Sequence, residues 1–342
     1  MPGKKDVLTR IIEDSRSQVE FSGVVYMKQG DEIIAQAPYD YANRSDQRLN
    51  TVHTRFGIAS GCKLFTAIGI CQLVEEGYFS FETPIKECLN IPFPAFDEKI
   101  TIHHLLTHTS GIPDYFDEAV MKDYEHLWQD LPVYRMKTIK DFLPLFQNKK
   151  MMFPPGDRFH YNNAGYLVLG LIIEQYSGLR FTEYIELKVF RMNVSGYFSM
   201  DQLPANTALG YIDHENGTWR TNSYSIPVKG GPDGGAYTTG PDMIKLWEAL
   251  LKFELLSEEQ TQTLLHTHVH VKEQVNYGYG VWIIKNEDAI FKYQVMGYDP
   301  GVSFCSSGYP EYNLKLVIPS NKERGPMDVM NAIDNDFIKK RW

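Results

Sequence analysis

The spacing of apolar and polar residues divides the chain into helical and extended segments. In the first segment, KKDVLTRIIEDSRS, apolar residues recur with helical spacing, which predicts a helix over residues 5–18. The next two segments, FSGVVYMKQG and DEIIAQAPY, have the composition of strands and meet at the turn signal Gln29-Gly30-Asp31. The pattern therefore predicts a helix followed by a β-hairpin over 21–39.

Helical patterns dominate the middle of the chain, and strand patterns return near its end. A helix is predicted over about 61–76, ended by Gly77, and the capping-box signature Thr239-Gly-Pro-Asp242 predicts another helix through Leu251. Further helical patterns lie around 101–107, 137–147, 164–177 and 181–190. Four strand-like segments, YGVWIIK, IFKYQV, VSFCSS and NLKLVIP, precede the amphipathic segment MDVMNAIDNDFIKKRW, which predicts a closing helix.

This order of elements predicts an α/β fold of the α+β kind, in one domain over 1–342. Sequential hairpins favour an antiparallel sheet, with the two terminal helices on one of its faces. The sheet lobe is expected to comprise about 1–77 and 226–342, and a helical lobe, about 78–225, is inserted between these parts. Clefts between lobes are common ligand sites, so we expect the functional site there.

Composition excludes several classes of protein. The chain has 342 residues, of which 43% are hydrophobic and 23% charged, so a largely disordered chain is excluded. The net charge of −9, without a clear basic stretch, argues against nucleic acid as a partner. The four cysteines show no CxxC spacing, which argues against a disulfide framework or a zinc cluster and favours a reducing compartment.

Localisation is predicted from the apolar runs. The N-terminal segment has no apolar run of the kind found in a signal peptide. The longest apolar stretch, Ala164 to Ile173, is half the length needed to cross a bilayer. We therefore expect a cytoplasmic protein without a membrane span.

A candidate nucleophile lies where RFGIAS turns into the helix predicted at 61–76. A serine hydroxyl needs an adjacent base to become reactive. Residues i and i+3 share one face of a helical turn, so the Lys63 amine can reach the Ser60 hydroxyl. Ser-x-x-Lys occurs by chance in chains of this length, and a serine that only caps the helix remains the alternative.

The longer context of this motif is more specific. The blocks RFGIASGCKLFTAIGICQLVEEG, ITIHHLLTHTSGIPDYF, FHYNNAGYLVLGLIIEQYSG and GGAYTTGPDMIKLW resemble the serine β-lactamase and penicillin-binding-protein family, in particular its class C-like members, which include esterases and D-amino-acid peptidases. The blocks follow the family's order from about 55 to 250, and the flanking strands extend the likeness over most of 20–340. The resemblance implies a β-lactamase/transpeptidase-like fold.

The resemblance also implies roles for individual residues. Ser60 would form an acyl-enzyme with Lys63 and Tyr161 as its catalytic partners, because Tyr161-Asn162-Asn163 matches the family's Tyr-x-Asn motif. Asn163 would hold the lysine and the substrate amide. Gly297 would allow close approach of the substrate, and the backbone N–H groups of Ser60 and Tyr298 would form the oxyanion hole. No metal or organic cofactor is implied.

One position departs from the family pattern. The third motif, Lys-Thr-Gly or His-x-Gly, would fall at Val295-Met296-Gly297, so valine replaces the cation that is expected to line the cleft. Recognition of a substrate carboxylate is therefore in doubt. Lys292 and Lys229 are the candidate replacements.

Other motifs have simpler interpretations. His104 and His108 have the spacing of a zinc helix, but the glutamate of H-E-x-x-H is absent. His266-x-His268-x-His270 would share one face of a strand, and surface histidines explain this pattern better than a metal site. The stretch Gly230–Gly235 lacks the phosphate-loop lysine and is interpreted as a turn beside the cleft, and Tyr41 of a second Tyr-x-Asn match as structural.

Two function classes lead. The first is a serine hydrolase that acts through Ser60 on a β-lactam, a D-amino peptide or amide, or an ester. The second is a non-hydrolytic protein of the same fold that binds penicillin or a peptidoglycan fragment. A metallohydrolase built on the histidines ranks third. The expected partner is a small-molecule or peptide substrate.

Overall fold

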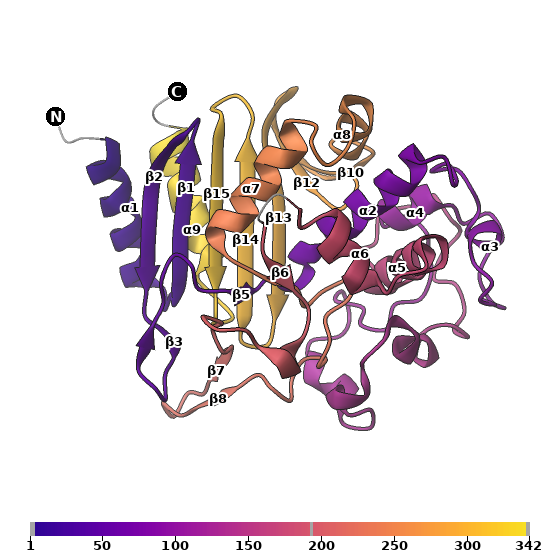
Figure 1. Ribbon diagram of the computed structural model, residues 1–342, viewed down its shortest axis with the longest axis horizontal. Coiled ribbons are helices and arrows are strands. Elements are labelled where there is room, and N and C mark those ends of the chain that lie inside the picture. Colours follow the sequence, from indigo (N-terminus) through magenta and orange to yellow (C-terminus); the bar gives the residue numbers. More distant parts are fainter. Residues whose placement is uncertain (1–3, 192–193, 340–342) are drawn as a thin grey trace.

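An eight-stranded antiparallel sheet organises the computed structural model, which describes residues 4–191 and 194–339 (Figure 1). The strand order is β10-β11-β12-β13-β14-β15-β1-β2. The strands are β1 (Gly23–Gln29), β2 (Glu32–Tyr39), β10 (Val269–Lys272), β11 (Val275–Tyr277), β12 (Trp282–Asn286), β13 (Ala289–Asp299), β14 (Val302–Tyr309) and β15 (Leu314–Ser320). The N-terminal hairpin joins the C-terminal strands because β1 pairs with β15, with Tyr26 opposite Val317. The predicted hairpin and antiparallel sheet are confirmed.

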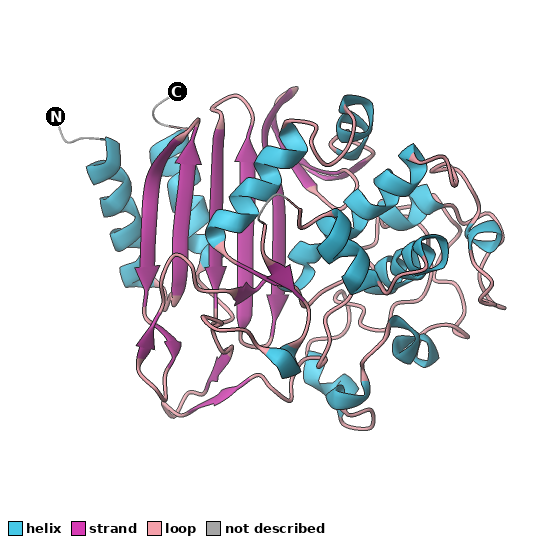
Figure 2. Ribbon diagram, viewed as in Figure 1, coloured by secondary structure: helices cyan, strands magenta, loops and turns pink. Residues whose placement is uncertain are grey.

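The terminal helices cover one face of this sheet. Helix α1 (Lys4–Gln18) packs against α9 (Pro326–Ile333). In Figure 2, α9 runs behind the strands and α1 lies beside β2 at the edge of the sheet. Their apolar side chains share a buried cluster with the sheet, which includes Leu8, Ile12, Val25, Ile318 and Val329. The prediction that both terminal helices pack on the sheet that contains the 21–39 hairpin is therefore confirmed.

A second, larger buried cluster lies on the opposite face and extends into the helices beside the sheet. Helix α7 (Gly240–Leu251) crosses the sheet face, where the Trp247 indole N–H donates to Ser306 Oγ at 2.8 Å. Helix α2 (Lys63–Glu75) packs against α5 (Asn163–Ser177), and α2 also contacts α6 (Phe181–Lys188) and α8 (Glu258–Leu264) (Figure 1). The cluster thus connects the sheet to the helical part of the molecule.

The remaining elements are short. They are the helices α3 (Ile85–Cys88) and α4 (Ile102–Leu106), the 3₁₀ turns η1 (Ala59–Cys62), η2 (Tyr124–Trp128), η3 (Val133–Arg135), η4 (Ile139–Leu145) and η5 (Met200–Gln202), and the strands β3 (Tyr41–Asn43), β4 (Arg48–Leu49), β5 (Phe56–Gly57), β6 (Gly196–Tyr197), β7 (Tyr211–Asp213), β8 (Trp219–Thr221) and β9 (Tyr237–Thr238). Strand β9 lies between β5 and β6. Within residues 4–191 and 194–339, no helix combines the length and apolarity that a membrane span requires.

The structure departs from the predicted elements in several places, and short elements such as α3, α8, β7 and β8 were not predicted. The helix predicted at 137–147 is the 3₁₀ segment η4, because Pro144 lacks the N–H that an α-helix needs there. Strands β10 and β11 were not predicted, since segments of four and three residues are too short to show a clear alternation of apolar and polar residues. The closing helix passes from α9 into a π-helical turn over Asp334–Ile338, and the predicted residues 340–342 lie outside the described part.

Candidate active site

Ser60 lies in the 3₁₀ turn η1, between strand β5 and helix α2. The turn is tight: Gly61 N–H donates to Ile58 C=O at 2.8 Å, and Ala59 has a φ of 44°, in the left-handed region that costs a non-glycine residue energy. A Cβ at Gly297 would lie 2.7 Å from Ser60 N and 2.2 Å from Ile58 O. Only glycine therefore lets strand β13 approach the serine turn this closely.

Lys63 opens helix α2 and is 2% exposed. Its Nζ donates to three oxygens: Ser60 Oγ at 2.9 Å, Asn163 Oδ1 at 2.8 Å and the Asp233 carbonyl at 2.7 Å. The turn into α2 produces the first contact, because it places residues three positions apart on one side. The other two contacts bring α5 and the 230–235 loop close to Ser60.

Tyr161 completes the predicted catalytic group. Lys63 Nζ lies 5.0 Å from the centre of its ring, and the ring packs on His108 at 4.4 Å between centroids. Burial raises the pKa of the Tyr161 phenol well above its ordinary value, the charge of Glu118 raises it further, and a hydrogen bond with Ser60 opposes both effects. The neutral phenol is therefore the resting form of Tyr161.

Asn163 is held by Asp114, a residue that the sequence analysis did not select. The Asp114 carboxylate accepts from the backbone N–H groups of Asn163 at 2.7 Å, Ala164 at 2.9 Å and Tyr115 at 2.7 Å. Burial raises the Asp114 pKa to about 7, while these N–H groups and Lys63 lower it. Asp114 thus secures the start of α5, and with it the amide oxygen that accepts from Lys63.

The 230–235 stretch lies beside the cleft, as its turn-like composition indicated. A Cβ at Gly234 would lie 3.9 Å from Ser60 N, so this loop flanks the serine turn. Its Asp233 carboxylate accepts a short hydrogen bond from Tyr115 Oη. Burial raises the Asp233 pKa, and the nearby Lys63 charge lowers it.

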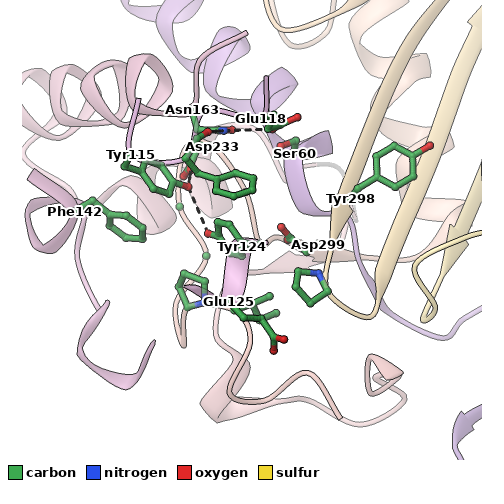
Figure 3. A pocket seen from close by; sticks show the side chains of 18 of the residues that line it. Ser60, Tyr115, Glu118, Tyr124, Glu125, Phe142, Asn163, Asp233, Tyr298 and Asp299 are labelled. Carbon is green, nitrogen blue, oxygen red and sulfur yellow. Dashed lines mark hydrogen bonds between the residues drawn. The ribbon is translucent and has the colours of Figure 1, made fainter. Parts of the chain in front are cut away.

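A cavity of about 500 Å³ opens between these elements (Figure 3). Of the predicted residues, Ser60, Asn163 and Tyr298 line it. Tyr298 follows Gly297 at the end of β13, and its side chain is 48% exposed. Residues of the wall that the sequence analysis missed are Tyr115, Glu118, Tyr124, Asp233 and Asp299. Tyr115 and Glu118 could have been selected from the sequence, because Tyr115 lies within the HTSGIPDYF segment and Glu118 lies two residues after it.

Val295 does not line this cavity, so the expectation that it does is wrong. The residue is 2% exposed and belongs to the large hydrophobic cluster, together with Ile58 and Phe304. It shares a strand face with Gly297, but the serine turn closes over that face and leaves the valine in the core.

The two lysines considered as replacement cations are both engaged. Lys292 is buried on the other side of the sheet, where its Nζ bonds Asp334 Oδ2 at 2.6 Å. Lys229 does line the cavity, but its Nζ bonds Ser199 Oγ and Asp201 Oδ1, both at 2.8 Å. Lys292 therefore cannot serve the site, and Lys229 serves it only if it leaves these partners.

The histidines have structural partners. Helix α4 ends at Leu106, and His108 has a φ of 58°, so His104 and His108 do not share a helix face. His108 Nδ1 accepts from Asn162 N–H at 3.0 Å, and its Nε2 lies 3.1 Å from Tyr277 Oη. His268 stacks on Tyr279 at 3.9 Å. Over the described ranges 4–191 and 194–339, no three potential ligand side chains are grouped so that they could hold a metal ion.

Comparison with known proteins agrees with this geometry. The family model described as Beta-lactamase matches residues 8–338, and the chain belongs to this family. The crystal structure of a penicillin-binding protein from Bacillus halodurans superimposes with a TM-score of 0.91 at 56% identity, covering 96% of this chain and 100% of that one.

The curated relatives share a lower sequence identity with this chain than the Bacillus halodurans protein does. A penicillin-binding protein of Bacillus subtilis is 26% identical over 341 residues, which cover 94% of this chain and 72% of the relative. The teichoic acid D-alanine hydrolase of Staphylococcus aureus is 26% identical over 265 residues, covering 77% of this chain and 62% of the relative. The chain is thus similar both to penicillin-binding proteins and to a hydrolase.

Proposed function

We propose that the protein is a serine hydrolase that forms an acyl-enzyme on Ser60. The observation that carries the proposal is the contact of 2.9 Å between Lys63 Nζ and Ser60 Oγ, beside the buried Tyr161 phenol. A serine hydroxyl with a basic partner at this distance has the arrangement of an activated nucleophile.

The reaction follows from these groups. The Lys63–Tyr161 pair takes the hydroxyl proton as Ser60 Oγ bonds to the substrate carbonyl carbon, and Tyr161 passes a proton to the leaving group as its bond to that carbon breaks. The backbone N–H groups of Ser60 and Tyr298 stabilise the negative oxygen of the tetrahedral intermediate. Water then attacks the acyl carbon and gives a proton to the Lys63–Tyr161 pair. The bond between the acyl carbon and Ser60 Oγ breaks, the pair gives a proton to Oγ, and the acid leaves.

The substrate is a β-lactam, a D-amino peptide or amide, or an ester. Support comes from the similarity to penicillin-binding proteins and to a teichoic acid D-alanine hydrolase. The cavity of about 500 Å³ is of the size that small-molecule sites have.

The test uses a nitrophenyl ester and a labelled penicillin, with the mass of the intact protein as readout. We expect turnover of the ester, an acyl adduct on Ser60, and loss of both in Ser60→Ala. Ser223→Ala is the matched control, because Ser223 is exposed and outside the cavity. A stable penicillin adduct without turnover would favour a penicillin-binding role, and binding that is unchanged in Ser60→Ala would favour the non-hydrolytic protein.

A further inference from the structure

Acidic groups outnumber basic ones close to Ser60 in the described part of the chain. Lys63 is the buried cation beside Ser60, and Asp233 and Asp299 line the same cavity as Ser60. Asp114 lies behind Asn163. One buried cation therefore acts on three carboxyl groups, so negative charge is in excess around Ser60.

The other charged residues of the cavity wall do not correct this deficit. Lys229 bonds Asp201, and Glu125 accepts from Arg220 at 2.7 Å, so each has its own partner. Four of the remaining charged residues are exposed, where water screens them: Lys122, Asp123, Glu323 and Arg324. Glu118 is exposed as well, but it accepts from Asn163 Nδ2 at 3.3 Å and so adds negative charge beside the site.

Asp299 is the carboxylate best placed to meet a substrate. It follows Tyr298, whose N–H is the proposed oxyanion donor, and pairs with Val302 at the end of β13. In the described structure no residue donates a hydrogen bond to its carboxylate. Burial raises its pKa to about 7, the charges of Asp233 and Glu118 raise it as well, and Lys63 lowers it.

Two tyrosine side chains line the cavity together with this carboxylate. Tyr124 and Tyr237 line the same cavity, and after burial the negative charge of Asp299 is among the causes that raise the pKa of each phenol. Figure 3 shows Tyr124, Asp299 and Ser60 around one opening. A carboxylate together with aromatic faces is a suitable environment for an organic cation.

We propose that Asp299 is a specificity residue that binds a primary ammonium group on the acyl part of the substrate. The preferred substrates are then aminoacyl esters or amides with a free amine, rather than N-acylated or carboxylate-bearing acyl donors. The inference rests on the proposed hydrolase function and names its substrate class. The position predicted to supply a carboxylate-binding cation holds the buried, uncharged Val295, so this position does not favour a carboxylate-bearing substrate.

The experiment compares two anilides that differ only in the amine: phenylalanine p-nitroanilide, as both enantiomers, and 3-phenylpropionic acid p-nitroanilide. We expect kcat/KM to favour the better amine-bearing enantiomer at least tenfold. Asp299→Asn should reduce this preference roughly ten- to hundredfold, the range for one charge-assisted hydrogen bond, with little change for the amine-free anilide. Asp299→Glu, which keeps the charge, should retain part of the preference.

The matched control is Glu311→Gln, which removes the same charge at an exposed turn away from the cavity. It should leave the preference unchanged. A wild-type protein without preference, or an equal loss on both anilides in folded Asp299→Asn, would overturn the role of Asp299.

Two further measurements separate this inference from the proposed function. Turnover of p-nitrophenyl acetate that depends on Ser60 tests the hydrolase alone. Binding of phenethylamine to Ser60→Ala, measured by calorimetry, tests ammonium recognition without chemistry. Weaker binding to Ser60→Ala/Asp299→Asn supports the inference even if no ester is cleaved, and equal binding to both variants contradicts it even if esters are cleaved.

Discussion

At the scale of single residues, the contacts of Lys63 explain how Ser60 is held. An ammonium group has three N–H donors, and three oxygens accept them. Two of the acceptors, the Asn163 amide and the Asp233 carbonyl, come from distant parts of the sequence. The lysine is therefore both the hydrogen-bond partner of Ser60 and the point where three segments meet.

The Asp299 carboxyl makes ammonium binding depend on pH. With its pKa raised to about 7, the group is mostly neutral at pH 6 and mostly charged at pH 8. An alkylamine such as phenethylamine stays protonated over this range, because alkylammonium groups lose their proton near pH 10. We therefore expect its dissociation constant for Ser60→Ala to fall about tenfold from pH 6 to pH 8.

The groups that face Asp299 set the control for this measurement. They are Lys63 on α2, Asp233 on the 230–235 loop, Glu118 on the loop after α4, and the phenols of Tyr124 and of Tyr237 on β9. The pKa of Asp233 is also raised from its ordinary value. Asp299→Asn should therefore remove most of the pH dependence, and the titration of Asp233 should account for a small remainder. An unchanged slope in Asp299→Asn would assign the titration to another group.

Val295 provides a second test at this scale. Because its side chain is buried in the hydrophobic cluster, Val295→His places a larger polar ring in the core and should cost about 1–3 kcal/mol of unfolding free energy. Activity on carboxylate-bearing β-lactams and on neutral esters should fall together. Val295→Ile, which stays apolar, should be milder. A rise in β-lactam turnover alone would show that the position reaches the cleft.

At the scale of elements, the start of helix α5 links the fold to the site. Asn162 Oδ1 accepts from Gly165 N–H at 2.8 Å, and Asp114 accepts from the N–H groups of Asn163 and Ala164. These are N–H groups of the first turn, which have no partner within the helix. Asp114 thus caps α5 and positions Asn163 in one arrangement.

Removal of this cap should affect both stability and catalysis. We expect Asp114→Ala to cost about 1–3 kcal/mol of unfolding free energy through the unsatisfied N–H groups, and to lower kcat more than it raises KM, because Asn163 then loses its position against Lys63. Denaturant titration and steady-state kinetics measure the two effects.

Ser257→Ala is the control, because it removes a helix cap that lies away from the candidate active site. Ser257 Oγ accepts from Gln260 N–H at 3.3 Å at the start of α8, and neither residue lines the cavity. This variant should lose stability and keep its kcat. An equal fall of kcat in both variants would mean that Asp114 acts only through stability.

The predictable elements were those with local signals. The hairpin at 21–39 and helix α5 follow from the spacing of apolar residues and from turn and cap residues nearby in the chain. The Ser60–Lys63 contact was also predictable, because the two residues are only three positions apart in the chain. Asp114, Asp233 and Asp299 were missed because their importance depends on which segments meet around Lys63, and single-chain patterns do not report such contacts. The burial of Val295 was missed for the same reason, since the serine turn covers it.

At the scale of the whole molecule, the sheet separates two hydrophobic clusters, and strand β13 belongs to both. Its end carries Gly297 and Asp299 into the active-site region, while Lys292 near its start lies under the terminal helices. The Lys292 ammonium bonds Asp334, and Tyr309 Oη on β14 donates to the same carboxylate. This buried network connects the C-terminal segment to the strand that supports the site.

The network should be important for stability, and its loss is the last prediction. Asp334→Ala leaves the Lys292 charge buried without its partner, so we expect a loss of about 3–5 kcal/mol in unfolding free energy by denaturant titration. The double variant Lys292→Met/Asp334→Leu removes both charges and should recover most of this loss, because an apolar pair avoids the desolvation of two ions. Glu98→Ala, which breaks the exposed Lys86–Glu98 pair, should have no measurable effect. If Asp334→Ala behaved like Glu98→Ala, water would have to reach Lys292, and the closed packing of the C-terminal segment on β13 would be contradicted.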